Sequence, residues 1–478
     1  MAFRARVETG SIPLGPSGKT CFDNIIKSTK AATASTGEEK EKKKKKKAPT
    51  AIRFFDEYSC YVREELENKE DGSGSAASGR KIFNPTCVAV GPRFHGQDGL
   101  KRGEELKRMA ARDFWEYSDQ PFSALYAQVR EVATAARGSY ASASSFTFTD
   151  DEFTAMMFVD GCFLLQLIAL QNNYVDGGMV PVDAAPTFES SYLNQVGAST
   201  LLADIFMVEN QIPWAVLHAL MSIRPVQVML FVDAHIASTV DVRSARPEPP
   251  PGQPGDYGPI HLLDLLWKRH VGPAASLMTV DTYLTYKQLE VATLTSATEL
   301  AEAGVDICPS STTRFADISF GRRWQLFGRL SLPPFILDHT NVALLLNMLT
   351  FELFYWDNDH NRSNVAAYFG MLSALMIREE DVRQLRRKGI VVTTLSDKEV
   401  IKLFNKLGAH TNGRNAQAST YLTRANINDF FKRQRMWISI HRFIYNNLKF
   451  LIAIGSFLSV TLSILKAILA LPAGSSSN

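Results

Sequence analysis

The longest unbroken apolar stretch of the chain lies near its C-terminal end. Residues 450–471 read FLIAIGSFLSVTLSILKAILAL, and about 22 helical residues extend for about 33 Å, enough to cross a hydrocarbon core of ~30 Å. Lys466 is the one charged residue of the stretch, and it lies near the far end, where its long side chain can reach the headgroups. The pattern predicts a transmembrane helix from Phe450 to Leu471, with a short tail at 472–478. The alternative is a C-terminal helix buried in the protein.

A second stretch, residues 151–171, is apolar on almost every face. An acidic start and the Asp160-Gly161 pair at its middle argue against a membrane span. The stretch therefore predicts a helix buried in the core of a folded domain.

Shorter helical patterns fill much of the remaining chain. A helix over 201–208 should stop before Pro213, because proline lacks an amide hydrogen and disfavours helical geometry in the residue before it. Pro213 should then begin a second helix. Further helices are expected over 341–356, 364–376 and 380–388.

Two Ser-x-x-Glu sequences, beginning at Ser296 and Ser396, are typical of capping boxes at helix starts. The first is followed by three short strand-like stretches at 305–307, 315–320 and 326–332. The predicted fold class is mainly α: a single large helical domain over 81–446 with a small β-sheet insertion and a Pro-rich loop at 243–259, plus one C-terminal transmembrane helix.

Residues 1–80 have a different composition. Residues 42–47 are all lysine, and residues 72–79 are rich in Gly, Ser and Ala. Such stretches bury too little apolar surface to offset chain entropy, so a disordered basic N-terminal region is expected, with a short helix over 52–66. The lysine run is interpreted as a solvated tail. The alternatives are attraction to anionic lipid and nuclear import, and the C-terminal anchor favours lipid over import.

Charge and cysteine content narrow the function classes. A net charge of +3 over 478 residues provides no overall field for nucleic acid. The five cysteines are widely spaced without a Cys-x-x-Cys pair, which favours a reducing compartment over a disulfide scaffold or zinc site. No secretory signal pattern opens the chain.

Basic residues precede the predicted span, and no charge follows Lys466. The positive-inside rule places the main domain in the cytosol, a tail-anchored arrangement in the plasma membrane or an endomembrane.

One sequence resembles a catalytic motif. Residues 15–20, from Gly15 to Thr20, read GPSGKT, like the second half of a phosphate-binding P-loop, and the apolar run 228–233 ending in Asp233 would be the magnesium-binding strand. However, Pro13 replaces the first glycine, no apolar strand precedes the loop, and a basic segment follows it. A nucleotide-binding enzyme is therefore the alternative to the leading interpretation.

Other candidate chemistry has a simpler structural explanation. Residues 357–361 read DNDHN and contain metal-ligand types, yet they fit a polar turn between two apolar helices. Cys162 lies among core residues without an electropositive neighbour in the sequence, so an inert thiol is expected. Asp160 and Glu209 would form a general-acid pair, but carboxylates in such surroundings are more often held by caps or backbone amides.

Several motifs occur in a defined order. FNP at 83–85 precedes VGPRFHG at 90–96, and MMFVDGCF follows at 156–163. ENQIP at 209–213 comes next, then HLLDLL at 261–266, ATEL with AGV over 297–305, and Asp381-Val382 with Leu385. Together these motifs resemble the plant "domain of unknown function 247" family over residues 81–471. Arg93 stands where the family has an aromatic residue, and the lysine-rich N-terminus lies outside the pattern.

The resemblance implies a helical, membrane-anchored plant protein with no established catalytic activity or cofactor. Some grass members of the family are associated with pollen self-incompatibility. The leading hypothesis is therefore a non-catalytic interaction protein, in recognition or signalling, with membrane lipid and an unidentified protein as partners and no nucleic acid or small-molecule substrate. The expected motif residues, with a structural role, are Gly91, Pro92, His95, Asp160, Gly161, Cys162, Phe163, Glu209, Asn210, Gln211, Ile212 and Pro213.

Overall fold

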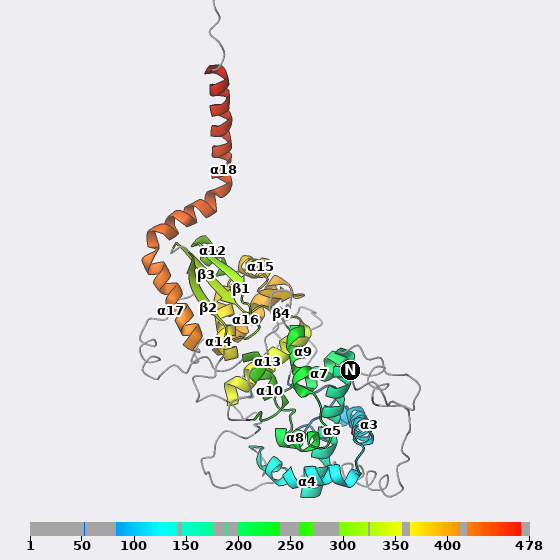
Figure 1. Ribbon diagram of the computed structural model, residues 1–478. Coiled ribbons are helices and arrows are strands. Elements are labelled where there is room, and N and C mark those ends of the chain that lie inside the picture. The colour runs from blue at the N-terminus through cyan, green and yellow to red at the C-terminus, as the bar shows by residue number, and fades with distance from the viewer. Residues whose placement is uncertain are drawn as a thin grey trace, which may run out of the picture.

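Helices make up most of the residues that the structure describes, as the computed structural model shows (Figure 1). The structure describes residues 52, 83–141, 146–175, 188, 198–239, 258–271, 296–323, 326–355, 364–411 and 418–469. The prediction of a mainly α fold with a small sheet is confirmed. The disorder expected for residues 1–80 lies outside the described residues apart from Ile52, as does most of the loop expected at 243–259.

The core of one end of the molecule forms around α5 (Asp150–Val175), which α3 (Lys101–Glu116), α4 (Phe122–Gly138) and α8 (Trp214–Met221) contact. All residues of α5 from 153 to 168 are buried, so the prediction of a core helix is confirmed. Ile52 is also buried here, and its backbone pairs with residues on either side of Tyr140.

The middle of the molecule contains α7 (Ala198–Ile205), α9 (Val228–Thr239) and α10 (Leu262–Val271). The first of these stops before Pro213, as predicted, but it ends at Ile205, three residues earlier than the predicted end at residue 208. The Gln211 side-chain amide donates to the carbonyls of Ile205 and Met207 at 2.7 and 2.9 Å. Because a side chain satisfies these carbonyls, the helix can end before the proline forces it to.

The sheet region lies toward the other end. In the three-stranded sheet, β3 (Phe327–Leu332) lies between β1 (Val305–Pro309), to which it is parallel, and β2 (Ser319–Arg323), to which it is antiparallel. A separate parallel pair joins β4 (Phe335–Leu337) to β5 (Val391–Thr393). This second pair was not predicted, because two three-residue strands leave no periodic signal.

The strand predicted at 315–320 is shifted toward the C-terminus. Phe315 is buried and stacks on His270 and Tyr368, with ring centroids 5.0 and 4.7 Å apart. Aromatic packing in the core therefore holds this part of the stretch, and β2 begins only at Ser319.

Five helices surround the strands: α12 (Ala297–Glu302), α13 (His339–Tyr355), α14 (Asn364–Leu375), α15 (Glu379–Arg387) and α16 (Asp397–Thr411). The capping box predicted at Ser396 forms completely, whereas Ser296 forms only half of its box, because the Glu299 carboxylate pairs with Arg378. The Ser296 hydroxyl accepts from the Glu299 amide, and the Ser396 hydroxyl accepts from the Glu399 amide while that glutamate accepts from the Ser396 backbone. α16 continues through Gly408 to Thr411.

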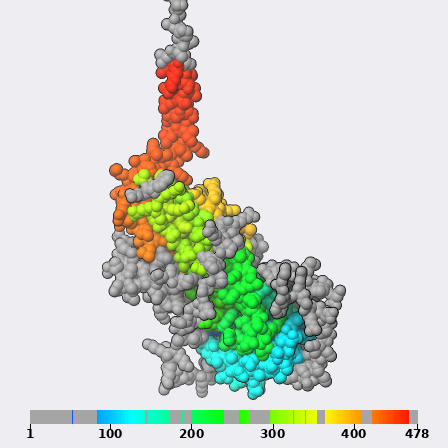
Figure 2. All heavy atoms as spheres, in the orientation of Figure 1, coloured from blue at the N-terminus to red at the C-terminus, as the bar shows by residue number. Residues whose placement is uncertain are grey.

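Two consecutive helices end the described chain. α17 (Ala418–Arg433) runs beside the sheet, and α18 (Arg435–Leu469) follows it after a bend. α18 continues without a break across the expected boundary between domain and span at 446–450. Its second part projects from the body as an isolated rod in Figures 1 and 2.

Candidate functional site

Residues 86–91, which connect the FNP and VGPRFHG motifs, form a loop. Side chains from helices far away in the sequence hold this loop in place. The Asp204 carboxylate at the end of α7 accepts from three successive backbone amides, those of Thr86, Cys87 and Val88, at 3.1, 2.6 and 3.0 Å. Buried backbone amides need such acceptors. Sequence reasoning missed Asp204, since an acidic residue near the end of a helix is typical of a surface position.

Asn210 continues this pattern along the loop. Its Oδ1 accepts from the Val90 amide at 2.7 Å, while Nδ2 donates to the carbonyls of Val88 and Asp204 at 3.0 and 2.9 Å. These three hydrogen bonds of the side chain go to backbone groups, two in the 86–91 loop and one at Asp204 of α7.

Asp160 and Lys107 form a buried ion pair at the end of the same loop. One Asp160 oxygen accepts from the Gly91 amide at 2.7 Å, and the other accepts from Lys107 Nζ at 2.6 Å. The ammonium also donates to the Ala89 carbonyl at 2.8 Å and lies 2.7 Å from Glu104. Residues 86–91 are therefore bonded to α3, α5 and α7 at once.

Burial opposes the charges of both partners in this pair. It would lower the pKa of Lys107, but the Asp160 and Glu104 carboxylates together raise that pKa above its ordinary value. Burial raises the pKa of Asp160, against the pull of Lys107. The ammonium and the Gly91 amide both donate to the carboxylate, and these contacts favour the ionised pair.

Two glycines let the loop approach its supports. Gly91 has φ +79°, and an added Cβ there would lie 2.6 Å from the Gln211 carbonyl oxygen. A Cβ on Gly103 in α3 would lie 2.1 Å from the Cys87 carbonyl oxygen. Only glycine fits either position without a backbone shift.

The ENQIP motif joins α7 to the start of α8 and α10. Besides its bonds to α7, Gln211 accepts from the Leu263 amide at 3.2 Å, and its carbonyl accepts from the Tyr140 hydroxyl at 3.1 Å. Pro213 is the residue before α8, and Ile212 is buried. The buried Glu209 carboxylate lies 3.5 Å from the guanidinium of Arg93, which is 43% exposed.

The remaining motif residues pack in the core or beside the ion pair. Pro92 is buried, and Phe163 packs edge-to-face on Phe188. A Cβ on Gly161 would lie 2.7 Å from Leu220, so this glycine sets the close contact between α5 and α8. The His95 ring packs on Phe148, with Nδ1 4.0 Å from Glu104 Oε1, an ion pair only when the imidazole is protonated.

Cys162 has an electropositive neighbour after all. Burial raises the pKa of the thiol well above its ordinary value, and Arg224 opposes the rise only in part. A thiol that stays protonated is a poor nucleophile.

Asp160 and Glu209 bind different groups, the first Gly91 and Lys107, the second Arg93. Within the described ranges, no group of three or more His, Cys, Asp or Glu side chains is placed to hold a metal ion. Residues 15–20 and 357–361 lie outside the described residues. The apolar run 228–233 is the start of helix α9, so its interpretation as a magnesium-binding strand was wrong.

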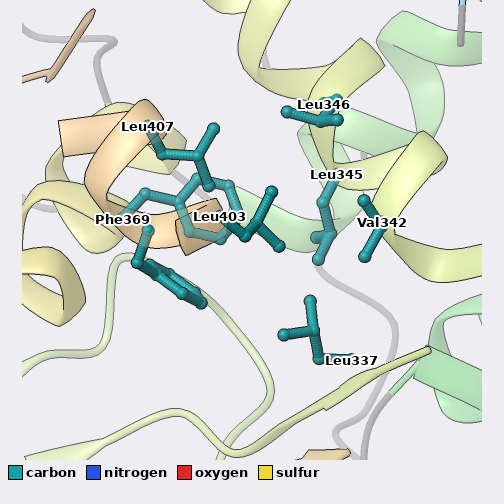
Figure 3. A pocket seen from close by; sticks show the side chains of 8 residues that line it. Leu337, Val342, Leu345, Leu346, Phe369, Leu403 and Leu407 are labelled. Atoms are coloured by element: carbon teal, nitrogen blue, oxygen red, sulfur yellow. The ribbon is translucent and has the colours of Figure 1, made fainter. Parts of the chain in front are cut away.

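A pocket between β4, α13, α14 and α16 is entirely apolar (Figure 3). Its empty space of about 220 Å³ includes open solvent. Pockets that hold cofactors or drug-sized ligands measure about 300–1,000 Å³ and carry some polar groups. This space is therefore a gap in side-chain packing.

Comparison with known proteins identifies the family. The family DUF247, described as plant protein of unknown function, matches residues 74–462. The chain belongs to the DUF247 family. All the motif residues that contact the 86–91 loop lie within residues 74–462.

The curated relatives that the chain matches are distant. UPF0481 protein At3g47200 of Arabidopsis thaliana is 22% identical over 68% of this chain and 69% of the relative. Putative UPF0481 protein At3g02645 of the same plant is 28% identical over 24% of this chain and 21% of the relative. No solved structure matches the chain.

Proposed function

We propose that this DUF247 protein is a non-catalytic interaction protein tethered to a membrane by α18, with its folded body on the cytosolic side. Recognition or signalling is the class of role it would serve. Pollen self-incompatibility, with which some grass members of the family are associated, belongs to that class.

The contrast between two apolar helices carries the proposal. α5 and α18 are both long and apolar enough to cross a membrane. In the most apolar window of α5, 94% of the residues are buried inside the protein, whereas none are buried in that of α18. Exposed apolar surface of this extent is unstable in water, and this supports a lipid environment for α18.

Basic residues support the proposed orientation. Lys432, Arg433, Arg435, Arg442 and Lys449 precede the apolar part of α18. Since cytoplasmic flanks of spans carry an excess of Lys and Arg, the flank that carries the folded body belongs on the cytosolic side.

The hydrogen bonds of the motif residues support a non-catalytic role. Asp160, Asn210 and Gln211 are buried, and each one binds backbone groups. A catalytic side chain must reach a substrate, whereas these groups are already engaged in holding the fold.

Alkaline extraction tests the tether. Leu458→Arg with Leu462→Arg places two charges at the middle of the proposed span, each costing about 2.5–3.5 kcal/mol in a bilayer. We expect the wild type to remain with the membrane pellet in carbonate and the double variant to be released. Ile377→Arg, at an exposed position of the body, is the matched control and should remain in the pellet. Release of the wild type would refute the proposal.

Proximity labelling tests the interaction role. The labelling enzyme is fused to the N-terminus of the full chain or, as a control, directly to residues 435–478. We expect a set of neighbours that the full chain labels and the anchor alone does not. Identical sets would mean that the folded body recruits no partner.

A further inference from the structure

The first part of α18 docks on the sheet end of the body before the helix projects. Phe327 of β3 packs edge-to-face on Trp437 and His441, with ring centroids 5.6 and 5.8 Å apart. His441 Nδ1 donates to the Glu302 carbonyl at 2.8 Å, and Arg442 lies 3.5 Å from the Glu302 carboxylate.

Gly304 lies beside this contact. An added Cβ there would lie 3.4 Å from Phe327 and 3.5 Å from His441, which are ordinary contact distances, so the position calls for glycine because its φ is +82°. The motif that follows α12 therefore borders the segment 435–449.

The outward face of this segment carries an apolar stripe with helical spacing. Met436, Ile440, Phe443, Ile444 and Leu448 are between 41% and 82% exposed. Positions i, i+4, i+7, i+8 and i+12 lie along one side of a helix, so these side chains form one continuous surface.

Cations flank the stripe along the chain. Lys432, Arg433, Arg435 and Lys449 are exposed on α17 and α18. Arg323 of β2 pairs in register with Phe327, the residue that contacts α18, which brings a further guanidinium to this end of the sheet. An apolar stripe beside basic groups is typical of a helix that lies in the headgroup region of an anionic membrane.

We propose that residues 435–449 form an interfacial helix that lies along an anionic membrane surface and holds the sheet end of the body against it. The inference rests on the membrane tether proposed above and adds how the body sits on the bilayer.

Continuity with the span selects lipid as the occupant of the stripe. Leu448 is separated from Phe450, the first residue of the proposed span, by Lys449 alone. In Figure 1 the first part of α18 runs obliquely over the body and the chain then bends into the projecting rod. With the rod upright in a bilayer, the first part lies near the membrane plane, where the stripe meets lipid.

Hydrogen–deuterium exchange of the full chain in vesicles tests the inference. The vesicles contain phosphatidylcholine with about one third phosphatidylserine. The test variant is Ile440→Glu with Phe443→Glu, on the stripe. The matched control is Ser439→Glu with Asn446→Glu, which adds the same charge at exposed positions outside the stripe.

We expect amides 436–448 to exchange about tenfold faster in the stripe variant than in the wild type, because two buried apolar contacts are lost. The control should stay within about twofold, and the span 450–466 should stay protected in every case. Equal exchange in all three proteins with a protected span would overturn the interfacial helix and leave the tether intact. An unprotected span would overturn the tether itself. If the amides of residues 436–448 lose their protection from exchange when each vesicle holds only one chain, a second copy of the chain, and not lipid, covers the stripe. That result would overturn the lipid inference.

Discussion

Asp160 holds the 86–91 loop through its buried carboxylate. Its carboxylate joins the Gly91 amide to the Lys107 ammonium, which in turn binds the Ala89 carbonyl. A pair of this kind contributes little net stability against an apolar replacement, but breaking it leaves an uncompensated buried charge. The loop conformation therefore depends on both partners.

Replacing one partner should be costly. We expect Asp160→Ala to lower the free energy of unfolding by about 3–5 kcal/mol, because Lys107 loses a partner and the Gly91 amide loses its acceptor. Denaturant titration of the solubilised chain measures this. Asp306→Ala, which breaks a surface pair with Lys388, should cost less than about 1 kcal/mol. An Asp160 variant as stable as the Asp306 variant would show that the motif is not a structural support.

Glu352 gives a pH dependence of opposite sign to an ordinary surface carboxylate. It is buried and accepts from Trp267 Nε1 and the amides of Val365 and Ala366 at 2.9, 2.8 and 2.7 Å. Burial outweighs these donors and raises its pKa from 4.5 to about 7. Between these two pH values the folded chain keeps a proton that the unfolded chain releases, so the free energy of unfolding falls as pH rises through this range.

Glu352→Gln should remove that dependence, which amounts to about 3 kcal/mol across the range. The quantity to measure is the difference in unfolding free energy between wild type and variant from pH 4.5 to 7. The difference is needed because burial lowers the pKa of His261 and His270 to about 3, and these residues make stability rise with pH in part of the same range. A difference that does not change with pH would contradict the protonated Glu352.

At the scale of elements, the close contact between α3 and the 86–91 loop depends on Gly103, which has no side chain. An added Cβ on Gly103 would meet the Cys87 backbone oxygen at 2.1 Å, whereas a Cβ on Gly138, at the end of α4, meets nothing within 4 Å. We expect Gly103→Ala to lower the unfolding free energy by about 1–3 kcal/mol through overpacking. Gly138→Ala should be neutral or stabilising by up to ~1 kcal/mol. Thermal melts of the two variants should shift in different directions, and equal shifts would show that the loop does not pack on α3.

The elements that the sequence predicted are those whose signal is local. The buried helix α5, the two serine N-caps and strands β1 and β3 follow from periodicity and from residues three positions apart. The pairing of β4 with β5 and the early end of α7 do not, because each depends on a contact between separated segments.

The motif cluster shows the same limit. The family resemblance singled out Asp160 and Asn210. It did not predict that both side chains hold the 86–91 loop. Asp204 binds amides 116–118 positions away in the sequence, and nothing in its neighbourhood marks that partner. Helical spacing in the sequence predicts which face of a helix a side chain lies on. The structure is needed to show which residues that face contacts.

At the scale of the whole molecule, helices α3, α4 and α8 and the projecting helix α18 lie at opposite ends. α3, α4 and α8 form one end of the body, and the sheet with α12, α17 and α18 forms the other (Figure 1). A body held by its sheet end presents the α3–α4 end away from the bilayer. In the proposed orientation, that end faces the cytosol and any soluble partner.

The side of the membrane on which the body lies is the central claim, and glycosylation reports it directly. The sequon at Asn361, Arg362 and Ser363 belongs to the body. A second sequon is added by a short extension after Asn478. In microsomes with intact lumenal transferase, only lumenal sequons receive glycan.

We expect glycan on the C-terminal extension and none on Asn361, detected as a single mobility shift that a glycosidase reverses. An Asn361→Gln variant should keep that shift, and a chain without the extension should show none. Glycan on Asn361 with an unmodified extension would place the body in the lumen and contradict the account.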